Sequence, residues 1–113
     1  MAESGVELTV AIRDTQVIGY LLLVLGEAAE VRQIYVRPTY FGAGVGDGLM
    51  RAALSRVAGS SVWLGTSKQN ARAIAFYRRH GFVIASERTF WVAGVPNDDW
   101  VMRRERDVAI PSG

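Results

Sequence analysis

The chain has 113 residues, of which half are hydrophobic and 21% are charged, and its formal net charge is +2. This composition is typical of a globular chain, and the length fits a single domain over residues 1–113. We expect a core at about residues 5–105 and a loose tail at 106–113. The absence of cysteine excludes a disulfide scaffold, a cysteine metal site and a thiol nucleophile.

Other classes of protein are disfavoured as well. The longest apolar run, residues 20–25, is too short to span a membrane. The first residues lack a basic region followed by an apolar one, so we expect no signal peptide and a cytoplasmic location. The single histidine, His80, disfavours a histidine metal cluster, and no metal is expected. Arg103, Arg104 and Arg106 are too few to argue for nucleic-acid binding.

The first third of the chain predicts three strands. Residues 6–13 alternate between apolar and polar side chains, with Val6, Leu8, Val10 and Ile12 on the apolar side, which is the pattern of a half-buried strand. A turn at residues 14–16 leads to a second strand at 17–25, which is apolar on both faces and therefore central. A third strand is expected at 29–36.

A glycine-dense segment follows the third strand. Arg37 and Pro38 break the strand, three glycines stand at positions 42, 44 and 46, and a helical pattern covers about residues 45–58. Glycine lets backbone N–H groups approach a ligand closely, and the start of a helix offers unpaired N–H groups with partial positive charge. The segment therefore favours a phosphate group, although an ordinary strand-to-helix turn has the same appearance.

Two well-known phosphate loops do not fit this segment. A P-loop requires a lysine at its end, and no lysine follows these glycines. The GxGxxG dinucleotide motif requires a third glycine, and the two possible positions hold Asp47 and Leu49.

The second half of the chain predicts a short strand, a helix and a final hairpin. The helix begins at a cap formed by Ser67 or Asn70 and ends near His80, before Gly81 in a left-handed conformation. The strands are expected at residues 62–66, 82–92 and 99–104, with a hairpin loop at 94–98.

Two motifs resemble those of the GNAT superfamily, the acyl-CoA-dependent N-acetyltransferases. The segment Tyr35-Val36-Arg37-Pro38 followed by glycines at 44 and 46 is similar to the family's pyrophosphate loop, except that Phe41 stands where the family usually has Arg or Gln. Residues 70–82, NARAIAFYRRHGF, resemble the family's second CoA motif. The resemblance runs from about residue 5 to 105. It implies an α/β (α+β) fold with a central mixed, mostly antiparallel sheet and two helices.

The resemblance also implies roles for individual residues. The loop would hold the CoA pyrophosphate through backbone amides, and the preceding strand would hold the thioester and pantetheine arm; these residues are Phe41, Gly42, Ala43, Gly44, Val45, Gly46 and Asp47, and Ile34, Tyr35 and Val36. Asn70 would contact the pantetheine or phosphate arm, with a plain helix cap as the alternative. Phe76 would border the cofactor or belong to the core. Tyr77 would protonate the leaving thiolate or serve as a core aromatic residue.

The general base is less defined. Glu30 is the nearest carboxylate to the loop, and the alternation of a regular strand would place it on one face with residues 32, 34 and 36. An ordered water is the other possibility in this family. Trp91, Trp100, Asp98 and Asp99 surround the last hairpin, where the family shapes its acceptor pocket.

The function that the resemblance implies is acetyl transfer from acetyl-CoA to a primary amine, by direct attack in a ternary complex and without a metal. A non-catalytic CoA-binding module is the alternative, because the strand and two helices that open a complete GNAT domain are not found before the first hairpin. The chain would then be a truncated or naturally short member. Without those helices, apolar sheet surface such as that of residues 17–25 should lie open, so we expect a homodimer that covers it.

Overall fold

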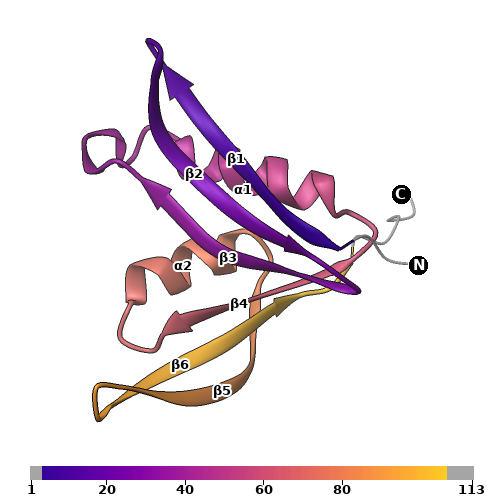
Figure 1. The fold of residues 1–113 in the computed structure, drawn as a ribbon, viewed down its shortest axis with the longest axis vertical. Helices are drawn as coiled ribbons and strands as arrows, with labels where there is room; N and C mark the ends of the chain where they lie inside the picture. The colour runs from indigo at the N-terminus through magenta and orange to yellow at the C-terminus, as the bar shows by residue number, and fades with distance from the viewer. Residues whose placement is uncertain (1–3, 107–113) are drawn as a thin grey trace. The chain divides into compact units, whose positions relative to one another are not determined.

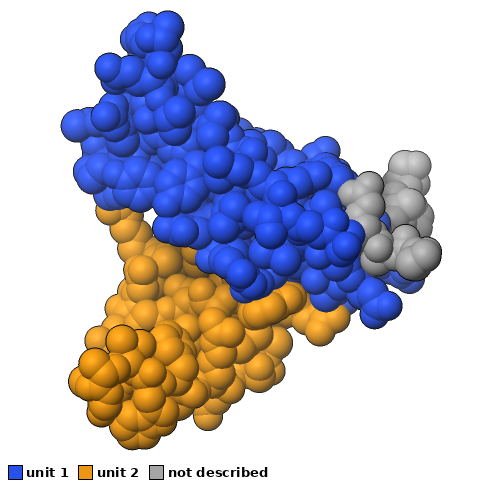
Figure 2. Space-filling view, viewed as in Figure 1, with its two compact units in different colours: residues 1–62, 105–113 blue, residues 63–104 orange. Residues whose placement is uncertain are grey.

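The structure, a computed structural model, describes residues 4–106 and divides them into two compact units, which are coloured blue and orange in Figure 2. The second unit is Trp63–Arg104, and the first contains the described residues up to Val62 together with Glu105 and Arg106. The loose tail expected at 106–113 lies outside the described residues except for Arg106. The single domain expected over the whole chain stays a prediction.

Six strands and two α-helices follow one another along the chain (Figure 1). Their bounds are β1 Gly5–Arg13, β2 Gln16–Leu25, β3 Ala28–Val36, α1 Val45–Arg56, β4 Ser61–Ser67, α2 Ala71–Arg79, β5 Val83–Val92 and β6 Val95–Arg104. A short 3-10 helix, Pro38–Tyr40, lies between β3 and α1. This order of elements is the one expected from the sequence. Within residues 4–106, no helix is long and apolar enough to cross a membrane.

In the first unit, β2 lies between β1 and β3 and is antiparallel to both, which confirms its expected central position. A two-residue turn joins β1 to β2, with φ of 50° at Asp14 and 65° at Thr15. Two consecutive residues with positive φ match the right-handed twist of a hairpin. The register shifts between Ala11 and Ile12 on β1 and again between Leu22 and Leu23 on β2.

Helix α1 packs on one face of this three-stranded sheet (Figure 1). The core of the unit consists of apolar side chains, namely Ile18, Leu21, Leu23, Ala29, Val31, Leu49, Met50, Ala53, Leu54, Val57 and Val62. The apolar face of the helix explains its position, because burying such side chains is the main driving force for packing.

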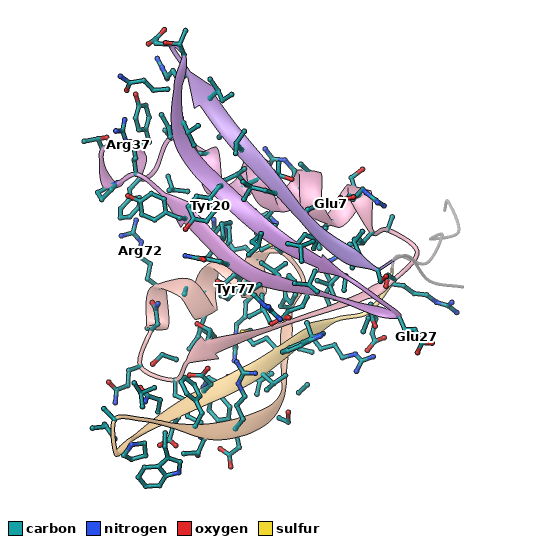
Figure 3. All side chains as sticks on the ribbon, viewed as in Figure 1. Glu7, Tyr20, Glu27, Arg37, Arg72 and Tyr77 are labelled. Atoms are coloured by element: carbon teal, nitrogen blue, oxygen red, sulfur yellow. The ribbon has the colours of Figure 1, made fainter. Side chains whose placement is uncertain are left out.

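The apolar side of β1 faces away from this core, so the expectation of a half-buried strand with its apolar side inward is wrong. Val6, Leu8, Val10 and Ile12 are 60%, 60%, 41% and 63% exposed. The polar side instead faces the helix, where Nη2 of Arg56 lies 2.8 Å from a carboxylate oxygen of Glu7. Figure 3 shows the labelled Glu7 beside α1. The open apolar surface expected around β2 is therefore found mainly on β1.

In the second unit, β6 lies between β4 and β5, and β5 and β6 form an antiparallel hairpin. The turn is Ala93-Gly94, with φ of 50° and 80°. The longer loop expected at residues 94–98 is wrong, because β6 already begins at Val95 and Pro96 pairs with Trp91. Leu64, Phe82 and Met102 are buried here.

Candidate functional site

The glycine segment between β3 and α1 is tightly turned. The 3-10 helix is followed by an N–H to carbonyl bond of 3.2 Å from Ala43 to Tyr40. Gly42 and Gly44 have φ of 82° and 83°, in the left-handed region that side chains other than glycine rarely adopt. Gly44 is also the residue that precedes the first turn of α1. The two glycines thus let the chain reverse directly into the helix.

The amides at the start of α1 precede the helix's own hydrogen bonds. The N–H of Gly48 donates to the carbonyl of Gly44 at 3.0 Å, so the amides of Val45, Gly46 and Asp47 come before that first bond. A Cβ placed on Gly42 or Gly44 would meet no atom within 4 Å. The loop therefore offers helix-start amides beside open space, which suits a phosphate group.

The end of β3 is held by its pairing with β2. Ile34, Tyr35 and Val36 lie opposite Leu21, Tyr20 and Gly19, and the N–H of Arg37 donates to the carbonyl of Ile18 at 2.8 Å. The ring of Tyr35 lies 5.6 Å from that of Tyr20, centre to centre, and Tyr35 is 45% exposed. The sequence did not predict this pair of rings, because the two tyrosines meet only through the register of β2 and β3. Figure 3 labels Tyr20 on β2. The acyl-binding role of the β3 backbone stays a prediction.

A bulge in β3 changes the face on which Glu30 lies. Alternate residues of β2, which share one face, pair across the bulge as Val24 with Glu30, Leu22 with Gln33, and Tyr20 with Tyr35. Glu30 therefore shares its face with Tyr35. The expectation that Glu30 lies on the same face as Ile34 and Val36 is wrong, because the extra residue at Arg32 shifts the alternation.

The carboxylate of Glu30 already has a cationic partner. Nη2 of Arg32 donates to Oε1 of Glu30 at 3.0 Å. The Glu30 side chain is only 15% exposed, whereas that of Arg32 is 58% exposed. A general base must come within hydrogen-bond reach of the proton that it removes, and the Arg32 guanidinium already holds Oε1 of Glu30. The role of Glu30 stays a prediction.

Asn70 caps helix α2, as one of the two sequence interpretations expected. Its Oδ1 accepts a hydrogen bond from the N–H of Ala73 at 3.1 Å. Ser67 makes a weaker turn of its own, in which its Oγ accepts from the N–H of Gln69 at 3.3 Å. At the other end of the helix Gly81 has φ of 88°, which confirms the expected left-handed stop.

Tyr77 lies on α2 among aromatic rings of the second unit. Its ring centre is 5.5 Å from that of Phe76 and 6.1 Å from that of Phe82. Burial raises the pKa of the Tyr77 phenol above its usual 10.0, because the charged phenolate is desolvated there. The phenol therefore stays protonated throughout the neutral range, as a proton or hydrogen-bond donor must.

Phe76 is half-buried and makes further ring contacts. Its ring centre lies 4.9 Å from the ring of His80 and 5.3 Å from the guanidinium carbon of Arg79. No residue of α2 is fully buried.

The residues expected to bind acetyl-CoA come from both units. Those of the glycine loop and of β3 belong to the first unit, and Asn70, Phe76 and Tyr77 belong to the second.

The residues expected around an acceptor pocket lie on the β5–β6 hairpin. Trp91 is 68% exposed, and Nζ of Lys68 stands 4.3 Å from the ring centre of Trp100. Asp98 accepts a hydrogen bond of 2.7 Å from the hydroxyl of Thr89, and Asp99 forms an ion pair with Arg88.

Among residues 4–106, no three His, Cys, Asp or Glu side chains gather in a way that could hold a metal.

A family model described as an acetyltransferase (GNAT) domain matches residues 4–84 of the chain. The chain belongs to the GNAT family. An N-acetyltransferase of Mycobacterium tuberculosis, itself named uncharacterized, is 36% identical over 97 residues, which cover 81% of this chain and 62% of that protein. The chain thus spans about three-fifths of the length of this relative.

Solved structures show the same fold. Nourseothricin acetyltransferase matches with a TM-score of 0.79 and 26% identity, over 90% of this chain and 66% of that one. The PaiA N-acetyltransferase of Thermoplasma acidophilum, in complex with coenzyme A, matches with a TM-score of 0.73 and 22% identity, over 88% of this chain and 60% of that one. The expected GNAT-like α/β fold is confirmed.

Proposed function

We propose that the chain acts as an N-acetyltransferase, which moves an acetyl group from acetyl-CoA to a primary amine. The observation that carries the proposal is the start of α1, where the amides of Val45, Gly46 and Asp47 precede the first helical hydrogen bond and follow a glycine in the left-handed region. Open space at Gly42 and Gly44 leaves room for a pyrophosphate against these amides. Membership of the GNAT family supports this assignment.

The remaining residues have separate tasks in this proposal. Backbone groups of Ile34, Tyr35 and Val36 hold the acyl arm, and Asn70 contributes a polar contact at the start of α2. The reaction forms a bond from the amine nitrogen to the acetyl carbon and breaks the bond from that carbon to sulfur. Tyr77 supplies a protonated phenol to the leaving thiolate, whose conjugate acid has a pKa of about 8.5 in an ordinary thiol.

The acceptor amine must lose a proton before it attacks, because an alkyl ammonium has a pKa of about 10. We propose that Glu30 or an ordered water takes this proton. A non-catalytic CoA-binding module is the alternative function. The specific observation in its favour is that Glu30, the proposed carboxylate base, is already engaged in an ion pair of 3.0 Å with Arg32.

Titration calorimetry of acetyl-CoA with matched loop variants tests the proposal. Gly44→Glu adds a charged side chain at a φ of 83° and should abolish binding. Gly48→Ala is the control, because its Cβ would meet nothing within 4 Å and Gly48 has no positive φ. Unchanged binding in the Gly44 variant contradicts the proposed site.

Release of free thiol in the presence of an amine panel then distinguishes the two functions. Turnover on any amine establishes the transferase. Tight binding of acetyl-CoA without turnover on the whole panel favours the binding module.

We further propose a homodimer in which the exposed apolar row of β1 is covered by a second copy. Val6, Leu8, Val10 and Ile12 form this row, and Val17 of β2, opposite Ile12, extends it with 51% exposure. Contiguous apolar surface of this kind is characteristic of interfaces.

A further inference from the structure

Arg88 and Asp99 form an unequal ion pair on the β5–β6 hairpin. They lie directly opposite each other in the antiparallel register, and Nη2 of Arg88 stands 3.5 Å from Oδ2 of Asp99. Asp99 is buried, with 8% of its surface exposed, whereas the Arg88 side chain is 45% exposed. The carboxylate of Asp99 is therefore buried within the second unit, whereas the side chain of its partner Arg88 is partly in contact with solvent.

The guanidinium of Arg88 occupies a place built by neighbouring residues of the same unit. Its central carbon lies 5.9 Å from the ring centres of both Trp63 and Phe90. A Cβ placed on Gly65 would overlap the Nη2 atom of Arg88, so the absence of a side chain at Gly65 provides the space. A carboxylate and two aromatic rings surround one cation, which is a combination that attracts ammonium and guanidinium groups.

The hydrogen bond between Arg88 and Asp99 is weak enough for another cation to replace Arg88. A good charge-assisted hydrogen bond between nitrogen and carboxylate measures about 2.7–2.9 Å, and the bond observed here is longer. The exposed Arg88 side chain can leave toward solvent, because 45% of its surface already lies there. A buried carboxylate without a cation is costly, however, and another cation would be favoured in its place.

We propose that Trp63, Phe90 and Asp99 form a cation site that Arg88 fills in the free protein and that a second ammonium group of the acceptor takes over on binding. The acceptor class is then a small di- or polyamine, with one amine free to attack and another bound as a cation. This inference rests on the proposed acetyltransferase function.

A purely structural ion pair makes a different prediction for the same two residues. If Arg88 and Asp99 only join the two strands, loss of either side chain has similar effects and leaves amine binding unchanged. If Asp99 binds the amine and Arg88 competes with it, the two substitutions change amine affinity in opposite directions.

The test is titration calorimetry of 1,4-diaminobutane into the CoA-saturated protein, with n-butylamine as the single-charge comparison. Asp99→Asn should weaken diamine binding about ten-fold or more, as expected for loss of a hydrogen-bonded charge. Arg88→Ala should strengthen it about three-fold or more, because the diamine then enters a site with no competing cation and an uncompensated buried carboxylate. Glu87→Gln is the matched control, since it removes a carboxylate from the opposite face of β5, where Glu87 pairs with Lys68.

Equal diamine affinity in the wild type and Asp99→Asn overturns the inference, and so does weaker binding in Arg88→Ala. Absence of diamine binding in the wild type and in Arg88→Ala overturns it as well. If Asp99→Asn fails to fold, the sign of the Arg88→Ala effect decides, because Arg88 is half-exposed. Titration of acetyl-CoA into the same samples tests the acetyltransferase proposal separately, since the donor loop contains none of these residues.

Discussion

The carbonyl oxygen of Tyr35 lies 2.8 Å from the point where a Cβ atom on Gly19 would stand. Side-chain atoms of Leu49 and Val45 would be 3.3 Å from the same point. β2, β3 and the start of α1 therefore converge on Gly19. The missing side chain lets α1, with the candidate phosphate-binding amides, and the end of β3 both approach β2 closely.

Gly19→Ala is expected to lower the free energy of unfolding by about 1–3 kcal/mol, because overpacking against fixed backbone forces a shift. Gly48→Ala, on α1, adds a methyl group into open space and should raise it by about 0.5–1 kcal/mol. Urea unfolding of both variants measures the difference. Equal stability of the two would show that the convergence at Gly19 is not tight.

The sequence predicted the elements well and their orientation less well. The glycine loop and the Gly81 stop were placed correctly, and the cap of α2 is Asn70, one of the two residues expected, since each depends on local chemistry. Alternation in β1 showed two faces but not which face meets α1. The bulge at Arg32 was invisible, because it follows from the pairing of β3 with β2.

In the last hairpin as well, the elements were predicted but the details of strand pairing were not. Pro96 and Asn97 suggested a loop, yet Ala93 and Gly94 make the turn with positive φ at both residues. Arg88 received no role from the sequence, because its partners come from positions that only the sheet brings together. Contacts across strands depend on register, and no short sequence window contains it.

Substitution of Asn70 separates its capping role from a role in binding acetyl-CoA. Asn70→Ala removes the bond to the Ala73 amide and should lower the free energy of unfolding by about 1 kcal/mol. Asn70→Asp keeps the cap but adds a negative charge, so stability should be retained while acetyl-CoA affinity falls. Thermal unfolding and calorimetry report the two effects. Unchanged affinity in Asn70→Asp would mean that Asn70 is only a cap.

Tyr77→Phe retains the ring contacts with Phe76 and Phe82 and removes only the hydroxyl. We expect kcat to fall about ten-fold or more, because a positioned proton donor is lost, while acetyl-CoA affinity stays the same. Steady-state kinetics on any accepted amine measures this. An unchanged kcat would leave Tyr77 as an aromatic packing residue.

The raised pKa of Tyr77 also predicts a dependence of stability on pH. Above pH 10 the unfolded chain loses the phenolic proton while the folded chain keeps it, so the folded state binds more protons. The free energy of unfolding must therefore fall as pH rises from about 10 through the folded pKa. Below pH 10 this contribution is fully present. Tyr77→Phe should show a smaller alkaline loss in urea titrations at pH 9 and pH 11.

The exposed row on β1 predicts that association and folding depend on different leucines. Leu8 is 60% exposed, so Leu8→Ser should change the stability of the monomer by no more than about 0.5 kcal/mol. Leu21 is fully buried, and Leu21→Ala should cost about 2–5 kcal/mol. If a second copy covers the row, Leu8→Ser should also raise the dimer dissociation constant about ten-fold or more.

Val83→Ser is the control for this last experiment, because Val83 is 63% exposed and lies on β5, which does not contribute to the row. Light scattering at micromolar concentration should show a dimer for the wild type and the Val83 variant, and a monomer for Leu8→Ser. A monomeric wild type would contradict the homodimer. A dimer that survives in Leu8→Ser would place the interface on another surface, because loss of a central apolar side chain weakens the interface that contains it.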